Sequence, residues 1–132
     1  MSNKELVLDF LNSDYYQDKS TYDHYMHKDV TISWNSSEGF SKLNYQEFLE
    51  IVLGMGKTFT SLTAEISHAI VQKDKVAVRF TYNVETVEHP ESTALGHFFS
   101  FWEIKDEKLF KIYLMSHPAD ETPDNITSYL TV

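Results

Sequence analysis

The chain has 132 residues, which fits one domain that buries roughly two-thirds of the surface its unfolded form exposes. A hydrophobic fraction of 42% and an aromatic fraction of 14% support a packed core and argue against a disordered chain. The formal net charge of −9 disfavours nucleic acids and anionic membranes as partners, because both attract a basic surface. The absence of cysteine excludes disulfides, thiol nucleophiles and cysteine-based zinc sites.

The first ten residues, MSNKELVLDF, are charged and contain no long apolar run. Such a segment is typical neither of a signal peptide nor of a membrane-spanning helix. We therefore expect a cytoplasmic protein.

Two helices are predicted near the N-terminus. Ser2 and Glu5 have the spacing of a capping box, and apolar residues follow at helical spacing, so a first helix should reach residues 16–18. Residues 20–23 resemble a second cap and predict a short helix.

A strand and a third helix should follow. Residues 29–34 are rich in β-branched residues and alternate in polarity, which predicts a strand, and residues 35–39 have the composition of a loop. Asn44 and Glu47 should cap a third helix, and the glycines at 54 and 56 should end it.

The remainder of the chain up to Pro118 is predicted to be sheet. Tight turns are expected at residues 73–74 and 106–107, and a polar loop at 88–92. The four predicted strands span residues 58–72, 75–87, 93–104 and 108–117.

Helices followed by antiparallel hairpins predict an α+β fold. Strands of this length twist and curl, so three N-terminal helices packed on the strongly curved sheet would enclose a cavity. We expect this domain to span residues 1–118. Residues 119–132 should form a loosely docked tail, held by Ile126, Tyr129, Leu130 and Val132.

The element order resembles that of the nuclear transport factor 2-like superfamily, in its SnoaL-like and ketosteroid-isomerase-like branches. The resemblance is carried by HKDVTISW (27–34), DKVAVRFTYNVET (74–86) and EKLFKIYLMSHP (107–118). It implies a cone-shaped α+β barrel with a hydrophobic pocket, often dimeric through the sheet face. Isomerases, cyclases, hydrolases, dehydratases and binding domains share this fold, so the fold alone does not decide the function.

Many SnoaL-like proteins have an aspartate facing the pocket at the end of the last strand. This chain departs from that pattern, because the resemblance places His117 there and Tyr113 at a pocket position that is commonly aromatic. An imidazole suits general acid–base catalysis, and a tyrosine hydroxyl can donate to an oxyanion, so we predict these as the catalytic residues. The alternatives are a strand-end histidine bonded to backbone or water, and an ordinary core tyrosine.

Other residues are predicted to line the pocket. His97, Phe99 and Glu103 share one face of their strand, although Glu103 could equally be solvated at the end of the sheet. The full predicted ligand-binding set is Trp34, Tyr82, His97, Phe99, Glu103 and Met115. Arg79 is expected on the outer face of the sheet, paired with an acidic residue there or across a dimer.

We predict neither a cofactor nor a metal. His24 and His27 are three residues apart, but no third histidine follows at ligand spacing. Motifs of the glycine-rich phosphate loop and of the serine-hydrolase elbow are absent from the sequence.

Two functions from different classes follow. The first is a small-molecule-binding domain for a hydrophobic carbonyl compound, with acid–base catalysis of isomerisation, cyclisation or dehydration and without metal or nucleotide. The alternative is a non-catalytic dimerisation or protein-interaction module whose pocket is filled. A roomy cavity with clustered polar groups would favour the first function, and a filled interior the second.

Overall fold

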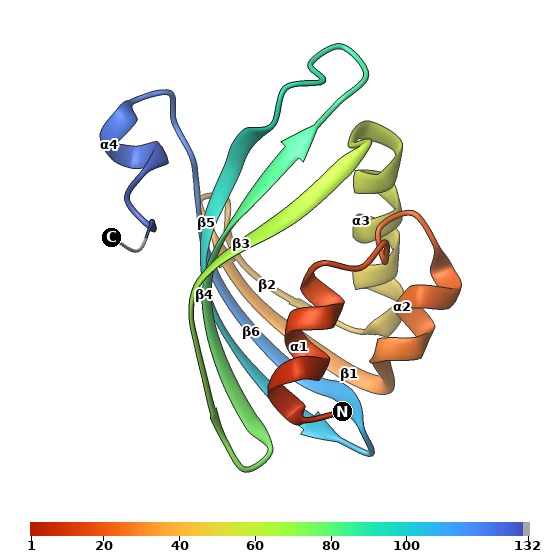
Figure 1. Ribbon diagram of the computed structural model, residues 1–132. Coiled ribbons are helices and arrows are strands. Elements are labelled where there is room, and N and C mark those ends of the chain that lie inside the picture. The colour runs from red at the N-terminus through yellow and green to blue at the C-terminus, as the bar shows by residue number, and fades with distance from the viewer. Residues whose placement is uncertain (131–132) are drawn as a thin grey trace.

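A computed structural model of the chain describes residues 1–130. Its six-stranded sheet has the order β2-β1-β6-β5-β4-β3, with every neighbouring pair antiparallel except β1 and β6. The sheet curves strongly, and the first three helices lie on its concave side (Figure 1). The elements are α1 (Asn3–Leu11), α2 (Lys19–Tyr25), β1 (Met26–Ser36), β2 (Gly39–Leu43), α3 (Tyr45–Thr58), β3 (Ser61–Gln72), β4 (Lys75–Glu85), β5 (Thr93–Lys105), β6 (Lys108–Pro118) and α4 (Pro123–Ile126). The predicted α+β fold is confirmed.

The caps that start α1 and α3 are those expected from the sequence. Ser2 accepts a hydrogen bond from the Glu5 amide, and Asn44 and Glu47 complete both halves of a capping box. In α2 the cap is Asp18, which accepts from the Ser20 amide, rather than a residue in the segment 20–23.

Helix α1 ends at Leu11, earlier than predicted. The residues after it instead satisfy amides of the edge strand β3, because Asn12 Oδ1 accepts from the Ala64 amide and the Tyr16 hydroxyl accepts from the Leu62 amide. Helix α3 continues past Gly54 and Gly56 to Thr58, so the prediction that these glycines end it was wrong.

Strand β2 was not predicted. Its five residues pair with β1 across the short turn at 37–38, so the expected loop at 35–39 is largely strand. None of the five is buried, so the segment lacks the apolar alternation by which strands are recognised. The two tight turns lie where they were predicted, with positive φ angles of 56° at Lys73, 54° at Asp106 and 62° at Glu107.

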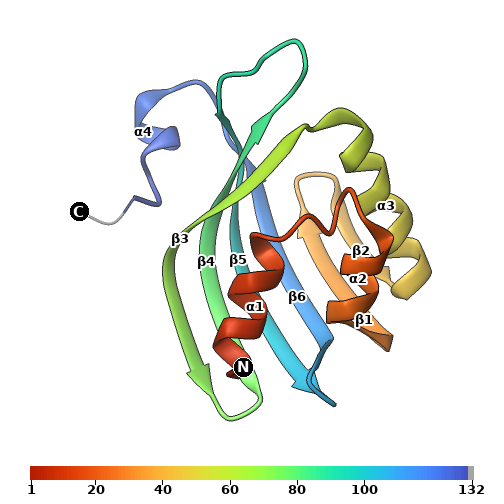
Figure 2. The same ribbon diagram turned by 45° about the vertical axis from the view of Figure 1, so that its right-hand side comes forward.

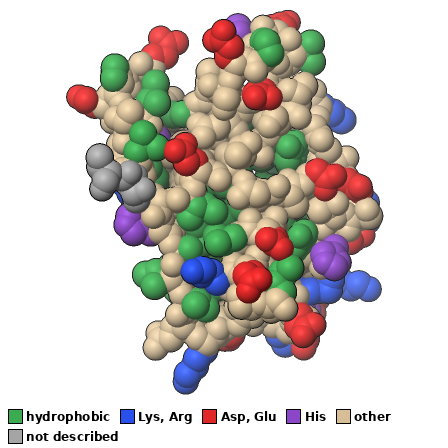
Figure 3. Space-filling view, in the orientation of Figure 1, with side chains coloured by type: hydrophobic (Ala, Val, Ile, Leu, Met, Phe, Trp, Pro, Cys, Tyr) green, Lys and Arg blue, Asp and Glu red, His purple; other side chains and the backbone are tan. Residues whose placement is uncertain are grey.

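The main core lies between the concave face and the helices. Its largest fully buried side chains are Tyr22, Phe10, Phe80, Leu11, Met26, Ile32, Leu109 and Ile112. The longest helix has 14 residues, and none of the helices within residues 1–130 is long and apolar enough to cross a membrane. Figure 3 shows acidic side chains spread over the face seen in Figure 1, in keeping with the net charge.

The C-terminal segment lies on the opposite, convex side of the sheet, with α4 away from the other helices (Figures 1 and 2). Arg79 is on this outer face, as predicted. Its partners are the Ser67 hydroxyl, the Ser128 carbonyl and the Tyr129 ring rather than an acidic residue. Val132, which was expected to help dock the tail, lies outside the described residues.

Candidate functional site

A cavity of about 550 Å³ lies between the concave face of the sheet and helices α1 and α3. This volume lies within the range of roughly 300–1,000 Å³ that is usual for small-molecule sites. Most of its wall is apolar or aromatic, and the principal lining residues of this kind are Phe10, Leu11, Trp34, Phe48, Val52, Met55, Phe80, Phe98, Trp102, Ile112 and Leu114.

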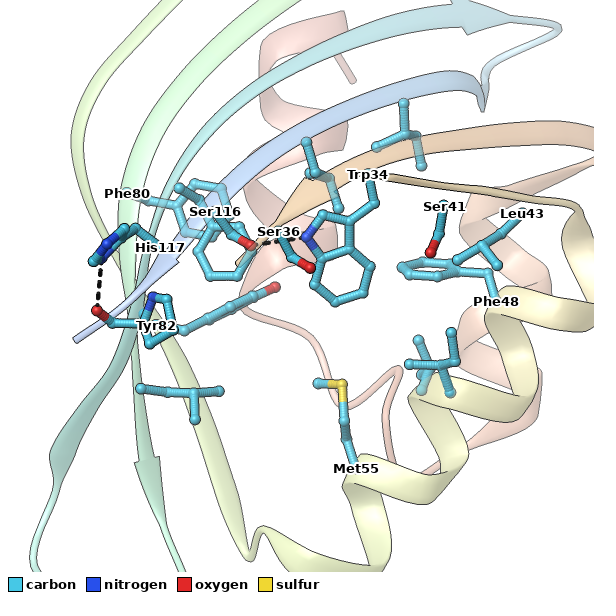
Figure 4. Close-up of a pocket in the computed structure, with 18 of the residues that line it drawn as sticks. Trp34, Ser36, Ser41, Leu43, Phe48, Met55, Phe80, Tyr82, Ser116 and His117 are labelled. Carbon is cyan, nitrogen blue, oxygen red and sulfur yellow. Dashed lines mark hydrogen bonds between the residues drawn. The ribbon is translucent and has the colours of Figure 1, made fainter. Parts of the chain in front are cut away.

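The cavity has a buried end and an exposed mouth. At the buried end lie core side chains such as Phe10, Phe80 and Trp102. At the mouth lie exposed residues of the β1–β2 turn, α3, β5 and the end of β6, namely Ser37, Glu38, Gly39, Ile51, Leu95, His117 and Pro118. Figure 4 shows Met55 extending from α3 into the space that Trp34 and Tyr82 face.

One polar group on the wall joins the two parallel strands. The Trp34 indole in β1 donates a hydrogen bond of 2.8 Å from Nε1 to Ser116 Oγ in β6 (Figure 4). This bond satisfies the indole N–H, which is costly to leave unpaired inside a protein. Because the Ser116 oxygen accepts it, the serine proton remains available to a second acceptor.

The second polar group is a pair of tyrosine hydroxyls. Tyr15, from the segment after α1, and Tyr82, from β4, are 2.7 Å apart at their hydroxyl oxygens, and both line the cavity. Tyr15 stacks on Phe10 with a centroid distance of 4.1 Å, and Tyr82 packs edge-on against Phe80 at 5.0 Å and Phe98 at 5.4 Å. Burial raises the pKa of both hydroxyls well above its usual value, so both remain protonated at neutral pH.

Of the predicted site residues, Trp34, Tyr82 and His117 line the cavity. His117 does so only at the mouth, where its side chain is exposed and its Nδ1 donates to the Pro118 carbonyl at 3.0 Å (Figure 4). Its register partner in β5 is His97, which faces the convex side, so the His117 imidazole points to that side too, away from the cavity (Figure 4). Its predicted catalytic role remains a prediction.

Tyr113 and Met115 lie on the convex face, so the prediction that they line the pocket was wrong. The cause is a bulge in β6: Leu109 pairs with Ile104 and Lys111 with Glu103, which leaves Phe110 as an extra residue. The bulge inverts the alternation that had placed Leu109 and Tyr113 on one face. The concave face of β6 carries Leu109, Ile112, Leu114 and Ser116 instead.

His97, Phe99 and Glu103 also lie on the convex face, and their prediction as pocket residues was wrong. His97 is buried, but by the C-terminal segment: its Nδ1 is 2.8 Å from the Thr81 hydroxyl and its Nε2 is 3.1 Å from Asn125 Oδ1. Phe99 is 57% exposed, and Glu103 lies 3.9 Å from Lys75 at the end of the sheet. Alternation had grouped these residues correctly but could not say which face was concave.

Sequence reasoning missed Tyr15 and Ser116. The first helix was predicted to extend past Tyr15, and a tyrosine within a helix does not by itself indicate a binding site. Ser116 was assigned to the face opposite the pocket. The register of β6 could have found Ser116, which belongs to the face of Trp102 and Leu114 once Phe110 is recognised as a bulge. The sequence carries no comparable signal for Tyr15.

Few charged or titratable side chains line the cavity. Within residues 1–130 no three histidine, aspartate or glutamate side chains form a group that could hold a metal ion. The lining residues include a single carboxylate, Glu38, and a single imidazole, His117, both at the mouth. The buried residues of the cavity wall can therefore offer a ligand hydrogen bonds and apolar contacts.

Comparison with known proteins places the chain in a family. The sequence model of the SnoaL-like domain matches residues 8–112. The chain belongs to the SnoaL-like domain family. No curated protein has a sequence that matches it.

Solved structures share the fold of this SnoaL-like chain. Wild-type IdmH, a putative polyketide cyclase from Streptomyces antibioticus, matches with a TM-score of 0.70 and 13% identity over 100% of both chains. AclR, a putative hydroxylase from Streptomyces galilaeus, matches with a TM-score of 0.66 and 18% identity over 86% of this chain and 87% of its own. TerC, co-crystallised with polyporic acid, matches with a TM-score of 0.61 and 23% identity over 85% of this chain and 88% of its own.

Proposed function

We propose that this SnoaL-like domain binds a hydrophobic small molecule in the cavity between α3 and the concave face of the sheet. The observation that carries the proposal is the open volume of about 550 Å³, with a wall that is mainly apolar and aromatic. The alternative of a module with a filled pocket is disfavoured by the same observation. Two structural relatives add support, because IdmH is described as a putative polyketide cyclase and TerC was crystallised with polyporic acid.

A cavity-blocking variant tests this proposal. Met55 reaches into the cavity from α3, so Met55→Trp should fill part of the space, whereas Lys57→Trp places the same side chain at an exposed position of that helix. In a thermal-shift screen of hydrophobic carbonyl compounds, a ligand at about a hundred times its dissociation constant adds roughly 2.7 kcal/mol to stability. We expect shifts of several degrees in wild type and Lys57→Trp, and none in Met55→Trp. Equal shifts in all three proteins would place the ligand elsewhere.

Proton transfer at a bound carbonyl compound is a second candidate function, in the class of isomerisation, cyclisation or dehydration. It is favoured by the relative IdmH, a putative polyketide cyclase, and its candidate acid–base group is the His117 imidazole, which is exposed at the rim of the mouth. Tyr113 has no part in it, because it does not line the cavity.

The test follows exchange of the α-protons of 2-acetonaphthone for deuterium by NMR. Wild type should accelerate exchange, and His117→Ala should lose the acceleration while still binding the ketone. His68→Ala is the matched control, since that histidine is exposed on β3 and does not line the cavity. Unchanged exchange in His117→Ala would remove the catalytic role and keep the binding function.

We also propose a cytoplasmic homodimer that forms through the convex face. Four large side chains are exposed there on the neighbouring strands β5 and β6: Phe99 at 57%, Phe101 at 38%, Tyr113 at 41% and Met115 at 58%. Sedimentation equilibrium should show a dimer that Met115→Glu dissociates, because the charge would be desolvated at the interface. Val87→Glu, at an exposed position on the β4–β5 loop, should leave the dimer intact.

A further inference from the structure

The wall of the cavity contains a buried donor that the protein itself does not use. The Tyr15 and Tyr82 hydroxyls carry two protons, and their mutual hydrogen bond of 2.7 Å uses one. Across residues 1–130 neither hydroxyl makes another hydrogen bond to protein. One O–H proton of the pair is therefore free, and in Figure 4 the Tyr82 hydroxyl points into the cavity.

The two tyrosine rings are held in fixed positions, so their hydroxyl groups are already in place before a ligand binds. Tyr15 is 3% exposed and Tyr82 is 6% exposed. Their rings are fixed by contacts with Phe10, Phe80 and Phe98. An acceptor placed at this point would gain a preorganised hydrogen bond in an apolar surrounding, where such bonds are strong.

The charged residues around the cavity determine whether the acceptor atom of the ligand is charged or neutral. Lysine and arginine are absent from the lining residues of the described chain, and the one carboxylate, Glu38, stands at the mouth. An anionic ligand would lose its hydration without forming an ion pair with a lysine or arginine, and the Glu38 carboxylate at the mouth would repel it. A neutral carbonyl oxygen loses far less hydration and can be satisfied by one donor.

We infer, on the basis of the proposed binding function, that the cavity selects an uncharged ligand whose carbonyl-type oxygen accepts a hydrogen bond from the Tyr15–Tyr82 pair. The apolar remainder of the ligand lies against Phe80, Phe98 and the other aromatic residues of the wall. The tyrosine pair is thus a specificity determinant: it distinguishes a neutral ketone or quinone from the hydrocarbon that lacks the oxygen and from the carboxylate that carries a charge.

Three probes with one skeleton test the inference: 2-acetonaphthone, 2-ethylnaphthalene and 2-naphthoate. Dissociation constants are measured by calorimetry for wild type, Tyr82→Phe and Tyr15→Phe. Tyr22→Phe is the control, because it removes a buried hydroxyl that donates to the Tyr45 carbonyl and does not line the cavity. Circular dichroism establishes that each variant is folded.

We expect wild type to bind the ketone about tenfold more tightly than the hydrocarbon and to bind the carboxylate most weakly. Tyr82→Phe should abolish the tenfold preference while the affinity for the hydrocarbon is unchanged, and Tyr22→Phe should keep the preference. Tyr15→Phe tests the pair if Tyr82→Phe does not fold, and should reduce the preference too. Binding of all three probes with equal affinity would overturn the inference and leave the proposed function standing. Binding of none would overturn both.

Discussion

The Arg79 guanidinium lies 3.7 Å from the centroid of the Tyr129 ring, on the convex face of the sheet. Its Nη2 also donates to the Ser128 carbonyl at 3.3 Å, and the Tyr129 ring lies 4.8 Å from that of His97. Strand β4 thus helps to hold the C-terminal segment on the face opposite the cavity, together with the contact between His97 of β5 and Asn125 of α4. None of the residues in α4 is buried, so the helix adds little apolar contact to this docking.

Tyr129→Ala should release the segment from the sheet. The loss of the cation–π contact weakens docking by about 1–2 kcal/mol, which should raise amide hydrogen exchange within residues 119–130 several-fold. The global free energy of unfolding should change by less than about 1 kcal/mol, because the main core lies on the other face. Leu130→Ala, at a residue that is 47% exposed, is the control. Equal exchange in both variants would mean that Tyr129 does not hold the segment.

The two glycines of α3 should respond in opposite directions to substitution by alanine. A Cβ at Gly56 would lie 1.9 Å from the Tyr16 carbonyl oxygen, whereas a Cβ at Gly54 would meet nothing within 4 Å. Gly56→Ala must therefore push α3 away from the segment that carries Tyr15 and Tyr16, at a cost of about 1–3 kcal/mol. Gly54→Ala should stabilise the protein by about 0.5–1 kcal/mol through helix propensity. Urea unfolding measures both, and a loss in Gly54→Ala equal to that in Gly56→Ala would contradict the prediction.

The turn between β5 and β6 is strained by its sequence. Asp106 and Glu107 both have positive φ, at 54° and 62°, a conformation that glycine adopts without cost. Glu107→Gly should therefore raise the free energy of unfolding by about 0.5–1 kcal/mol, measured by urea denaturation. Lys105→Gly, in the adjoining strand, should lower it instead. A loss of stability in Glu107→Gly would show that the glutamate side chain contributes more than its backbone strain costs.

The sequence could predict those features of the fold that depend on a few neighbouring residues. Alternation located the four long strands, and turn chemistry placed residues 73–74 and 106–107, because both signals are confined to a few neighbouring residues. Alternation divides a strand into two faces without saying which is concave. In β5 both faces are aromatic, with Phe98 and Trp102 inside and Phe99 and Phe101 outside, so only tertiary packing separates them.

The candidate site was predicted less well for the same reason. A single bulge at Phe110 put the side chains of Tyr113, Met115 and His117 on the convex face and brought Ser116 into the cavity wall. The end of α1 at Leu11 could not be predicted either, because it depends on hydrogen bonds that Asn12 and Tyr16 accept from β3, more than 40 residues away in the chain. Trp34 and Tyr82 were found because apolar residues alternate without a break over 30–34 and over 76–82.

The Tyr82 hydroxyl should make stability fall at alkaline pH. Burial raises its pKa well above the usual 10.0, so the folded protein keeps the proton that the unfolded chain releases above about pH 10. A raised folded-state pKa contributes stability that is complete below the unfolded pKa and is lost as the pH rises beyond it, by up to about 1.4 kcal/mol per pH unit.

The variant Tyr82→Phe isolates this contribution. At neutral pH it should be less stable than wild type by about 1 kcal/mol, because the bond to Tyr15 is lost. Between about pH 9.5 and about pH 11, however, it should lose about 1 kcal/mol less than wild type does. Urea titrations at the two pH values measure the difference. If wild type and Tyr82→Phe lose equal stability, the Tyr82 hydroxyl ionises in the folded protein as it does in the unfolded chain, and the donor assigned to the cavity wall would not persist in alkaline solution.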